Sequence, residues 1–258
     1  MTVQDFSAGW ISPVLAYGMS VLGCALGLSG MSRSRATEGR ARMGWIAVGA
    51  VAIGGTGIWV MHFIAILGLA VPGQEVTYAL APTLLSMLLA IVVVGAGLCA
   101  AVYGKGRTPA LVIGGVFTGL GVASMHYLGM SAIRVDGTIS YRPVLVLLSI
   151  VIAIVASIVA LWFAVNVRGL GATLGAAMVM GVAVTGMHYV GMAAMLLYPT
   201  TGTAPAAGLT GTQLLMPLIA GIGLTTVVMI FIVGLAPSED EIIQNEQAEA
   251  AFRGLHSR

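Results

Sequence analysis

Charge is what this sequence has least of. Among its 258 residues, 8% are charged and 59% are hydrophobic, whereas a soluble domain has about 25% charged residues. This scarcity of charge excludes a water-soluble fold. The formal net charge of +2 is too small to indicate nucleic acid as a partner. The composition instead predicts that the chain's main partner is the lipid bilayer.

Residues that several kinds of site require are also missing. The two cysteines, Cys24 and Cys99, lie in separate apolar segments, which argues against a C-x-x-C motif and against a disulfide framework. Every aspartate and glutamate falls outside the apolar segments. A calcium, magnesium or di-iron site inside the membrane would therefore lack its oxygen ligands. The last apolar segment has no lysine, so a retinal Schiff base is excluded.

What the sequence does have is seven long apolar segments. They lie at residues 10–30, 44–70, 78–102, 109–132, 142–165, 170–197 and 212–236. Since a spanning helix needs about 20 apolar residues, we predict an all-α membrane protein whose seven transmembrane helices form one domain, residues 1–236. The polar tail, residues 237–258, should form a short helix with Ser238 as its N-cap before three acidic residues.

Basic residues are distributed unequally among the connections between these segments. The first, third and fifth connections hold Arg33, Arg35, Arg40, Arg42, Lys105, Arg107 and Arg168. The other three connections hold Arg134 and Arg142, which Glu75 and Asp136 balance. The positive-inside rule therefore predicts that the odd connections and the C-terminal tail lie in the cytoplasm, and the N-terminus outside.

A short motif occurs three times, once in each even-numbered segment. The copies read Met61-His62-Phe63, Met125-His126-Tyr127 and Met187-His188-Tyr189, and each follows a glycine six residues before its methionine. The repeated unit thus contains two helices, and the seventh helix is left over. Such units run parallel, so the three histidines are expected at one depth. His62 lies eight residues before its segment ends at residue 70, or roughly 12 Å below the outer helix end.

The repeated residues are predicted to share one helix face. Residues four positions apart lie on nearly the same face, so Met130 accompanies His126 and Met192 accompanies His188, whereas Ile66 takes that place in the first copy. Five glycines lie on this face as well: Gly55, Gly119, Gly181, Gly129 and Gly191. Because small residues let helices approach closely, we expect the three even helices to meet along this face.

Histidine and methionine side chains together indicate a metal site. Imidazole and thioether are neutral ligands, and thioether is soft enough to select Cu(I) over hard cations. The predicted ligands are His62, His126, His188, Met61, Met125, Met130, Met187 and Met192. Copper is therefore the predicted metal, and zinc held by three histidines is the second choice.

A purely structural role for the same residues is the alternative interpretation. A lone histidine in a helix can hydrogen-bond a nearby hydroxyl, and Ser124 and Thr185 lie close in sequence. Tyr127 and Tyr189 follow two of the histidines and would either support the site by hydrogen bonding or anchor the helices at the interface. Three histidines at equal depth favour function, because membranes rarely retain such groups without use.

The threefold motif, once MHF and twice MHY followed by x-Gly-Met, resembles the MHYT-domain family of bacterial integral membrane sensors. The resemblance covers residues 10–236. It implies a seven-helix sensory domain in the bacterial cytoplasmic membrane, with the motifs near the outer face. It also implies a copper site that senses a diatomic gas such as oxygen, carbon monoxide or nitric oxide. Our own hypothesis from the residues is that a metal held by the three histidines reports ligand or redox state.

Two departures from the family pattern affect these expectations. The fourth motif letter, threonine in the name-giving form, is Ile64, Leu128 and Val190 in the three copies, so no hydroxyl acts at that position. Many relatives continue into cytoplasmic domains that make or degrade cyclic di-GMP, or into histidine kinases. No catalytic motif is found in this sequence, so the chain is predicted not to be an enzyme and to signal through its tail or a separate cytoplasmic partner.

Two other function classes compete with a sensor. A copper transporter or copper-delivery protein would need ligands across the full membrane thickness, and the inner half offers only Met19, Met87, Cys24 and Cys99. A haem-binding membrane protein would need paired axial histidines on facing helices. The three histidines could supply such a pair, but no second layer is present to relay electrons.

Overall fold

Seven helices long and apolar enough to cross a membrane make up most of the chain, as predicted. The computed structural model describes residues 9–71, 74–105, 107–199 and 208–256. The spans are α1 (Ile11–Ala36), a continuous second span made of α2 (Gly39–Ala50), η1 (Val51–Val60) and α3 (Met61–Leu67), then α4 (Leu80–Tyr103), α5 (Thr108–Met130), α6 (Pro143–Asn166), α7 (Leu170–Ala193) and α8 (Gly211–Leu235).

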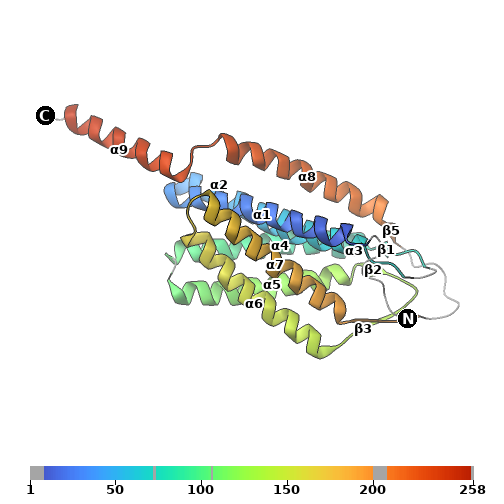
Figure 1. Cartoon of the computed structure of the whole chain (residues 1–258). Helices are drawn as coiled ribbons and strands as arrows, with labels where there is room; N and C mark the ends of the chain where they lie inside the picture. Colours follow the sequence, from blue (N-terminus) through green and yellow to red (C-terminus); the bar gives the residue numbers. More distant parts are fainter. Residues whose placement is uncertain (1–8, 72–73, 106, 200–207, 257–258) are drawn as a thin grey trace.

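The first six spans close into a ring. Each packs along the next in sequence, and α7 packs along α1 to complete the circle. Helix α8 lies outside this ring against α1 and η1, and Figure 1 shows it running along the edge of the bundle. Its hydroxyl Thr226 Oγ1 lies 2.6 Å from Thr56 Oγ1 of η1. Three two-helix units plus one extra helix are thus confirmed.

The second span contains ten residues of π-helix, η1, which no other described span has. This segment is rich in glycine, and its neighbours approach its backbone closely. A methyl group at Gly54 would lie 2.7 Å from the Ala90 carbonyl oxygen of α4, and a methyl group at Gly23 of α1 would overlap the Gly57 amide. π-Helical turns are rare and are often found at functional sites, and here the segment leads directly into the first motif.

The repeat glycines correct one expectation about packing. We expected Gly55, Gly119 and Gly181 to bring the second, fourth and sixth spans together. A methyl group at each of these glycines would instead meet the third, fifth or first span. The neighbours are Ile91 of α4, Ile154 of α6, and Tyr17 and Val21 of α1. The expectation was wrong because a shared face in sequence does not fix which helix that face meets. Contacts among α3, α5 and α7 are few.

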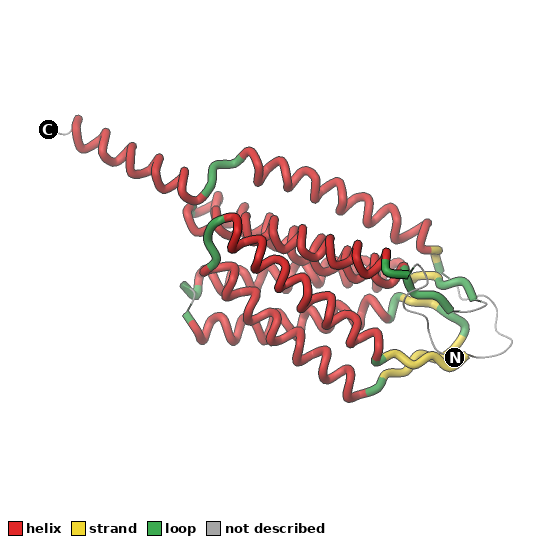
Figure 2. The backbone as a smooth tube through the Cα atoms, viewed as in Figure 1, coloured by secondary structure: helices red, strands yellow, loops and turns green. Residues whose placement is uncertain are grey.

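Two small sheets cover one end of the bundle, which we call the strand end (Figure 2). One contains β2 (Ile133–Arg134), β1 (Thr77–Tyr78) and β5 (Leu209–Thr210), and the other pairs β3 (Gly137–Tyr141) with β4 (Met195–Pro199). All pairs are antiparallel. The sequence did not predict these strands, which satisfy backbone groups in the connections between the spans.

At the opposite end, helix α9 (Glu239–His256) extends away from the bundle (Figure 1), and we call this the α9 end. The predicted cap is confirmed. Ser238 Oγ accepts a hydrogen bond from the Glu241 amide at 3.3 Å, and the Glu241 carboxylate accepts one from the Ser238 amide at 2.7 Å. This reciprocal pair is a capping box, which stabilises a helix start.

Candidate metal centre

The three motif histidines come together inside the ring of helices. His62 lies in α3, His126 in α5 and His188 in α7, and their side chains are at most 1% exposed. Each is four or five residues from the strand end of its helix, or roughly 6–8 Å. The predicted depth of 12 Å was therefore too large, because the second span ends at Leu67 rather than at residue 70. The shared depth is confirmed.

The Nδ1 atoms of the rings face one another. His62 Nδ1 lies 2.9 Å from His188 Nδ1 and 3.2 Å from His126 Nδ1. The ring centroids are 4.9, 4.9 and 5.2 Å apart, and the ring planes are nearly perpendicular to one another. Among the described residues, these three form a group whose ligand atoms all lie within 4.8 Å of each other. Three ring nitrogens from three helices thus lie close enough together to surround one ion.

Hydrogen bonding alone satisfies this arrangement poorly. A neutral imidazole has one N–H donor and one bare acceptor nitrogen. His62 Nδ1 takes part in both contacts but carries either one proton or one lone pair, so only one of the two contacts can be a full hydrogen bond. A cation at the centre would accept the lone pairs of all three Nδ1 atoms. Metal–nitrogen bonds of about 2.0–2.1 Å place neighbouring ligand nitrogens about 3.3–3.5 Å apart. The observed 2.9 and 3.2 Å fit such an ion after a small outward shift of the rings.

Two glycines make room for the other side of the rings. A methyl group at Gly129 of α5 would overlap Nε2 of His62, and one at Gly191 of α7 would overlap Nε2 of His126. The rings of His62 and His126 thus lie directly on the backbones of α5 and α7. The corresponding position in the first copy is Ala65, which is buried. The prediction that Gly129 and Gly191 serve contacts between even helices is therefore correct for these two positions.

Comparison with known proteins identifies the family. The family model described as "Bacterial signalling protein N terminal repeat", MHYT, matches residues 55–114 and 119–177. Each match begins at a repeat glycine, two turns before a motif histidine. The chain belongs to the MHYT family. The resemblance inferred from the sequence motif is thereby confirmed.

Several MHYT relatives are signalling proteins much longer than this chain. The bifunctional diguanylate cyclase/cyclic di-GMP phosphodiesterase MucR of Pseudomonas aeruginosa is 37% identical over 195 residues, which are 74% of this chain and 28% of the relative. An uncharacterized signaling protein of Caulobacter vibrioides is 28% identical over 251 residues, 94% of this chain and 30% of the relative.

A third relative, the cyclic di-GMP phosphodiesterase NbdA of Pseudomonas aeruginosa, is 36% identical over 166 residues, 62% of this chain and 21% of the relative. The chain therefore spans less than a third of the length of these curated relatives. No solved structure matches it.

The predicted methionines of the MHYT motifs are all buried. Met61, Met125 and Met187 each precede a histidine, while Met130 and Met192 lie at the ends of α5 and α7. Met187 contributes to an apolar cavity on the α9 side of the histidines, and Met130 lines a recess at the strand end. Their roles as ligands remain a prediction, whereas the three imidazoles form the group that the structure brings together.

The hydroxyl partners suggested for the histidines are absent among the described residues. Ser124 Oγ donates to the Leu120 carbonyl of its own helix, and the Thr185 hydroxyl is buried without a partner. The Tyr127 hydroxyl instead pairs with Ser149 Oγ of α6 at 2.7 Å. Tyr127 therefore ties α5 to α6 and does not hydrogen-bond the imidazoles.

An apolar cavity of about 50 Å³ lies directly beneath the histidines, toward the α9 end. Val122, Val184 and Ile58, each four residues before a motif histidine, line its upper part. Small residues of α6, Ala156 and Ala160, line its side and are themselves half-buried. This cavity could not be predicted from the sequence, because the residues that line it come from five different elements.

Proposed function

We propose that this MHYT protein is a membrane sensory module in which His62, His126 and His188 hold a copper ion. The single observation that supports the proposal is the convergence of their Nδ1 atoms, 2.9 and 3.2 Å apart. Burying a cluster of ionisable side chains inside a membrane costs free energy, and a bound cation would offset that cost. The bound ion would contribute a redox-active or ligand-binding centre.

The ligand chemistry favours copper over harder metals. All three clustered ligands are neutral nitrogens, and none of the described spans that hold them contains a carboxylate. Buried methionines at Met130, Met192, Met61, Met125 and Met187 offer thioether ligands that suit Cu(I). Zinc with three histidines is the second candidate. Haem is disfavoured, since ring centroids about 5 Å apart leave no room for a macrocycle between two axial ligands.

The apolar cavity supports a small nonpolar ligand as the signal. A volume of about 50 Å³ is several times what one water molecule needs, and apolar cavities tend to stay dry. Such a cavity next to a metal centre suits a diatomic gas such as oxygen, carbon monoxide or nitric oxide. We infer that the gas reaches the metal from within the membrane, through this space. The inferred signal is occupancy or redox state of the metal.

The names of the relatives suggest where the signal goes. MucR and NbdA are named for cyclic di-GMP synthesis and degradation. We propose that residues 1–236 form the sensor, and that residues 237–258 lead to a cytoplasmic signalling partner of that class. The excess of basic residues at the α9 end favours a bacterial inner-membrane protein with the α9 end in the cytoplasm. The chain itself is proposed to be non-catalytic.

Metal analysis of the purified protein tests the proposal. We expect about one copper per chain in the wild type, and loss of that copper when His62, His126 and His188 are all replaced by alanine. His256→Ala is the matched control, because this histidine lies outside the seven spans, and it should keep the metal. Full copper occupancy in the triple variant would overturn the proposal.

Copper uptake separates a sensor from a transporter. Transport requires ligands along the whole path, and the described residues place their one group of three metal-ligating side chains near the strand end. Cells lacking the protein should therefore accumulate as much copper as cells containing it. A clear difference in cellular copper would favour the transporter.

A further inference from the structure

A second polar site lies at the α9 end of the bundle, whereas the histidines lie near the strand end. It is a pocket of about 310 Å³ whose polar residues are Arg35, Arg42, Lys105 and Asn166. They come from the end of α1, the start of α2, the connection after α4, and the end of α6. The pocket therefore lies at the level where the spans α4 and α6 end.

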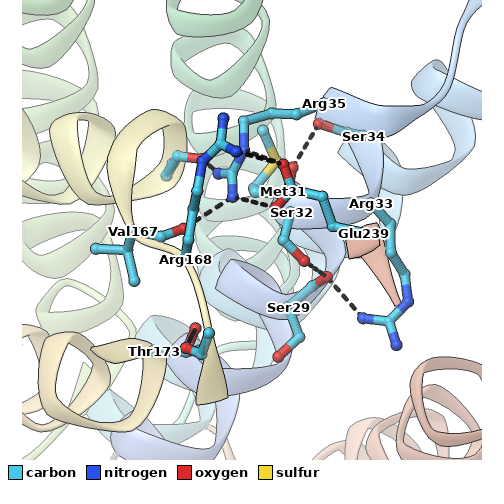
Figure 3. Close-up of polar contacts among 12 residues, drawn as sticks. Ser29, Met31, Ser32, Arg33, Ser34, Arg35, Val167, Arg168, Thr173 and Glu239 are labelled. Atoms are coloured by element: carbon cyan, nitrogen blue, oxygen red, sulfur yellow. Dashed lines mark hydrogen bonds and ion pairs between the residues drawn. The ribbon is translucent and has the colours of Figure 1, made fainter. Parts of the chain in front are cut away.

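Arg35 fixes one wall of this pocket. Its guanidinium donates to the Val167 carbonyl oxygen at 2.8 Å and to the Glu239 carboxylate at 3.0 Å (Figure 3). It also donates to the Ala164 carbonyl oxygen at 2.6 Å. The ion pair is mostly buried, with side chains 13% and 11% exposed. Arg168 lies 3.8 Å from the same carboxylate. Glu239 is therefore already paired on the side of α9.

Two cations of the pocket, Arg42 and Lys105, have N–H donors that form no hydrogen bond or close ion pair with the described residues. Arg42 uses its Nε on the Ser34 and Thr37 carbonyl oxygens, and its Nη2 comes only within 4.0 Å of Glu38, whose side chain is 93% exposed. Lys105 makes no ion pair with the described residues. Its φ is 55°, a backbone conformation that glycine adopts at lower cost. A lysine therefore stands at a position where the backbone favours glycine.

We propose that this pocket binds a phosphate group. Arginine and lysine together supply the charge-assisted donors that phosphate oxygens accept, and the two carboxylates nearby are outnumbered by the cations. Its apolar walls, Ala101, Val102 and Val165, suit the part of a lipid where the headgroup meets the glycerol. Basic pockets between spans at the membrane surface commonly hold anionic lipid headgroups. The site is independent of the metal centre and does not rest on it.

The test uses the full chain and a charge-matched pair of variants. The pocket variant is Arg42→Gln with Lys105→Gln, and the control is Arg40→Gln with Arg107→Gln, which removes two exposed cations of the same end outside the pocket. Native mass spectrometry measures retained phosphatidylglycerol. We expect retention about tenfold weaker in the pocket variant than in the control. If the double variant does not fold, Lys105→Gln alone removes one exposed donor and should weaken retention in the same direction.

A second arm identifies the source of the phosphate. Inorganic phosphate is titrated into protein in phosphatidylcholine nanodiscs and followed by calorimetry. Binding that the pocket variant loses and the control keeps would assign the site to a soluble phosphate. Retained phosphatidylglycerol that phosphate does not displace would assign it to a lipid headgroup. Equal behaviour of the pocket variant and the control in both arms would overturn the proposal.

Discussion

At the scale of single residues, the proposed metal centre depends on two glycines, which have no side chain. Gly129 and Gly191 leave the space that Nε2 of His62 and Nε2 of His126 occupy. Glycine inside a helix costs about 1 kcal/mol relative to alanine, so these two positions are locally unfavourable. Their placement against the rings gives a physical reason for them, because any larger side chain would push an imidazole away from the common point.

Replacing these glycines tests that reason. Gly129→Ala or Gly191→Ala should displace one ring and weaken metal affinity by about tenfold or more. Gly186→Ala is the matched control, since a methyl group there meets nothing within 4 Å. Competition with a chelator of known affinity measures the change. Unchanged affinity in both motif variants would show that the rings have room to move.

The sequence identified the histidines but not their geometry. Three copies of one motif predicted that His62, His126 and His188 come together at one depth, and the structure places their ring nitrogens within 4.8 Å of one another. Which nitrogen faces inward is set by the helix rotation and ring rotamers, so no sequence pattern contains it. The error about Gly119 and Gly181 has a similar cause. Gly119 faces Ile154 of α6 and Gly181 faces Tyr17 of α1, because the rotation of each helix about its own axis decides which neighbour a face meets.

At the scale of helices and strands, hydropathy predicted the seven spans but not the strands. Lipid selects continuous apolar helices, so all seven spans were found from composition and length. Three of the strands, β1, β2 and β5, were missed because they have two residues each, which is too short for an alternating pattern. Their pairing follows from where the helices bring the connections. The π-helix η1 was missed because it depends on tertiary packing around its glycines.

Helix α8 should be held to the ring partly by one polar contact. The Thr226 hydroxyl donates to the Ile222 carbonyl at 2.8 Å, so Thr56 of η1 is the donor in the 2.6 Å contact between the two threonines. We expect Thr226→Val to lower the free energy of unfolding by about 0.6 kcal/mol, the usual worth of such bonds in membranes.

Thr225→Val is the control for this contact, since Thr225 is exposed and bonds only Gly221 of its own helix among the described residues. Unfolding in mixed micelles measures both variants. Equal losses in the two variants would show that the contact between helices contributes nothing.

Helix α9 is predicted to depend on Arg35. This side chain joins the end of α6 to Glu239 in the first turn of α9. Among the described residues, Arg35→Gln should leave Glu239 with the more distant Arg168 as its ion-pair partner. Amide hydrogen exchange at Ile242 and Ile243 should then become about tenfold faster. Arg40→Gln, which removes an exposed charge nearby, should leave exchange unchanged, and equal acceleration in both variants would refute the role of Arg35.

At the scale of the whole molecule, the ring of six spans explains why one site can collect three equivalent ligands. Each two-helix unit contributes one histidine, and closure of α7 on α1 brings the three together near the strand end. A change in the metal's ligands would therefore act on α3, α5 and α7 at once. Helix α8 lies outside the ring and leads from its far end to α9.

The orientation proposed for the molecule has its own test. The α9 end carries most of the basic residues of the connections, so it should face the cytoplasm. Green fluorescent protein fused after residue 258 should fluoresce in living cells, and alkaline phosphatase fused there should be inactive. The reverse pattern would place α9 outside and remove the proposed cytoplasmic partner.

The account as a whole depends on three imidazoles sharing one metal ion. X-ray absorption at the copper edge of the loaded, purified protein measures this directly. We predict a first shell with three imidazole nitrogens at about 2.0 Å, accompanied by the outer-ring scattering typical of histidine. A first shell of sulfur alone, or with a single imidazole, would contradict it.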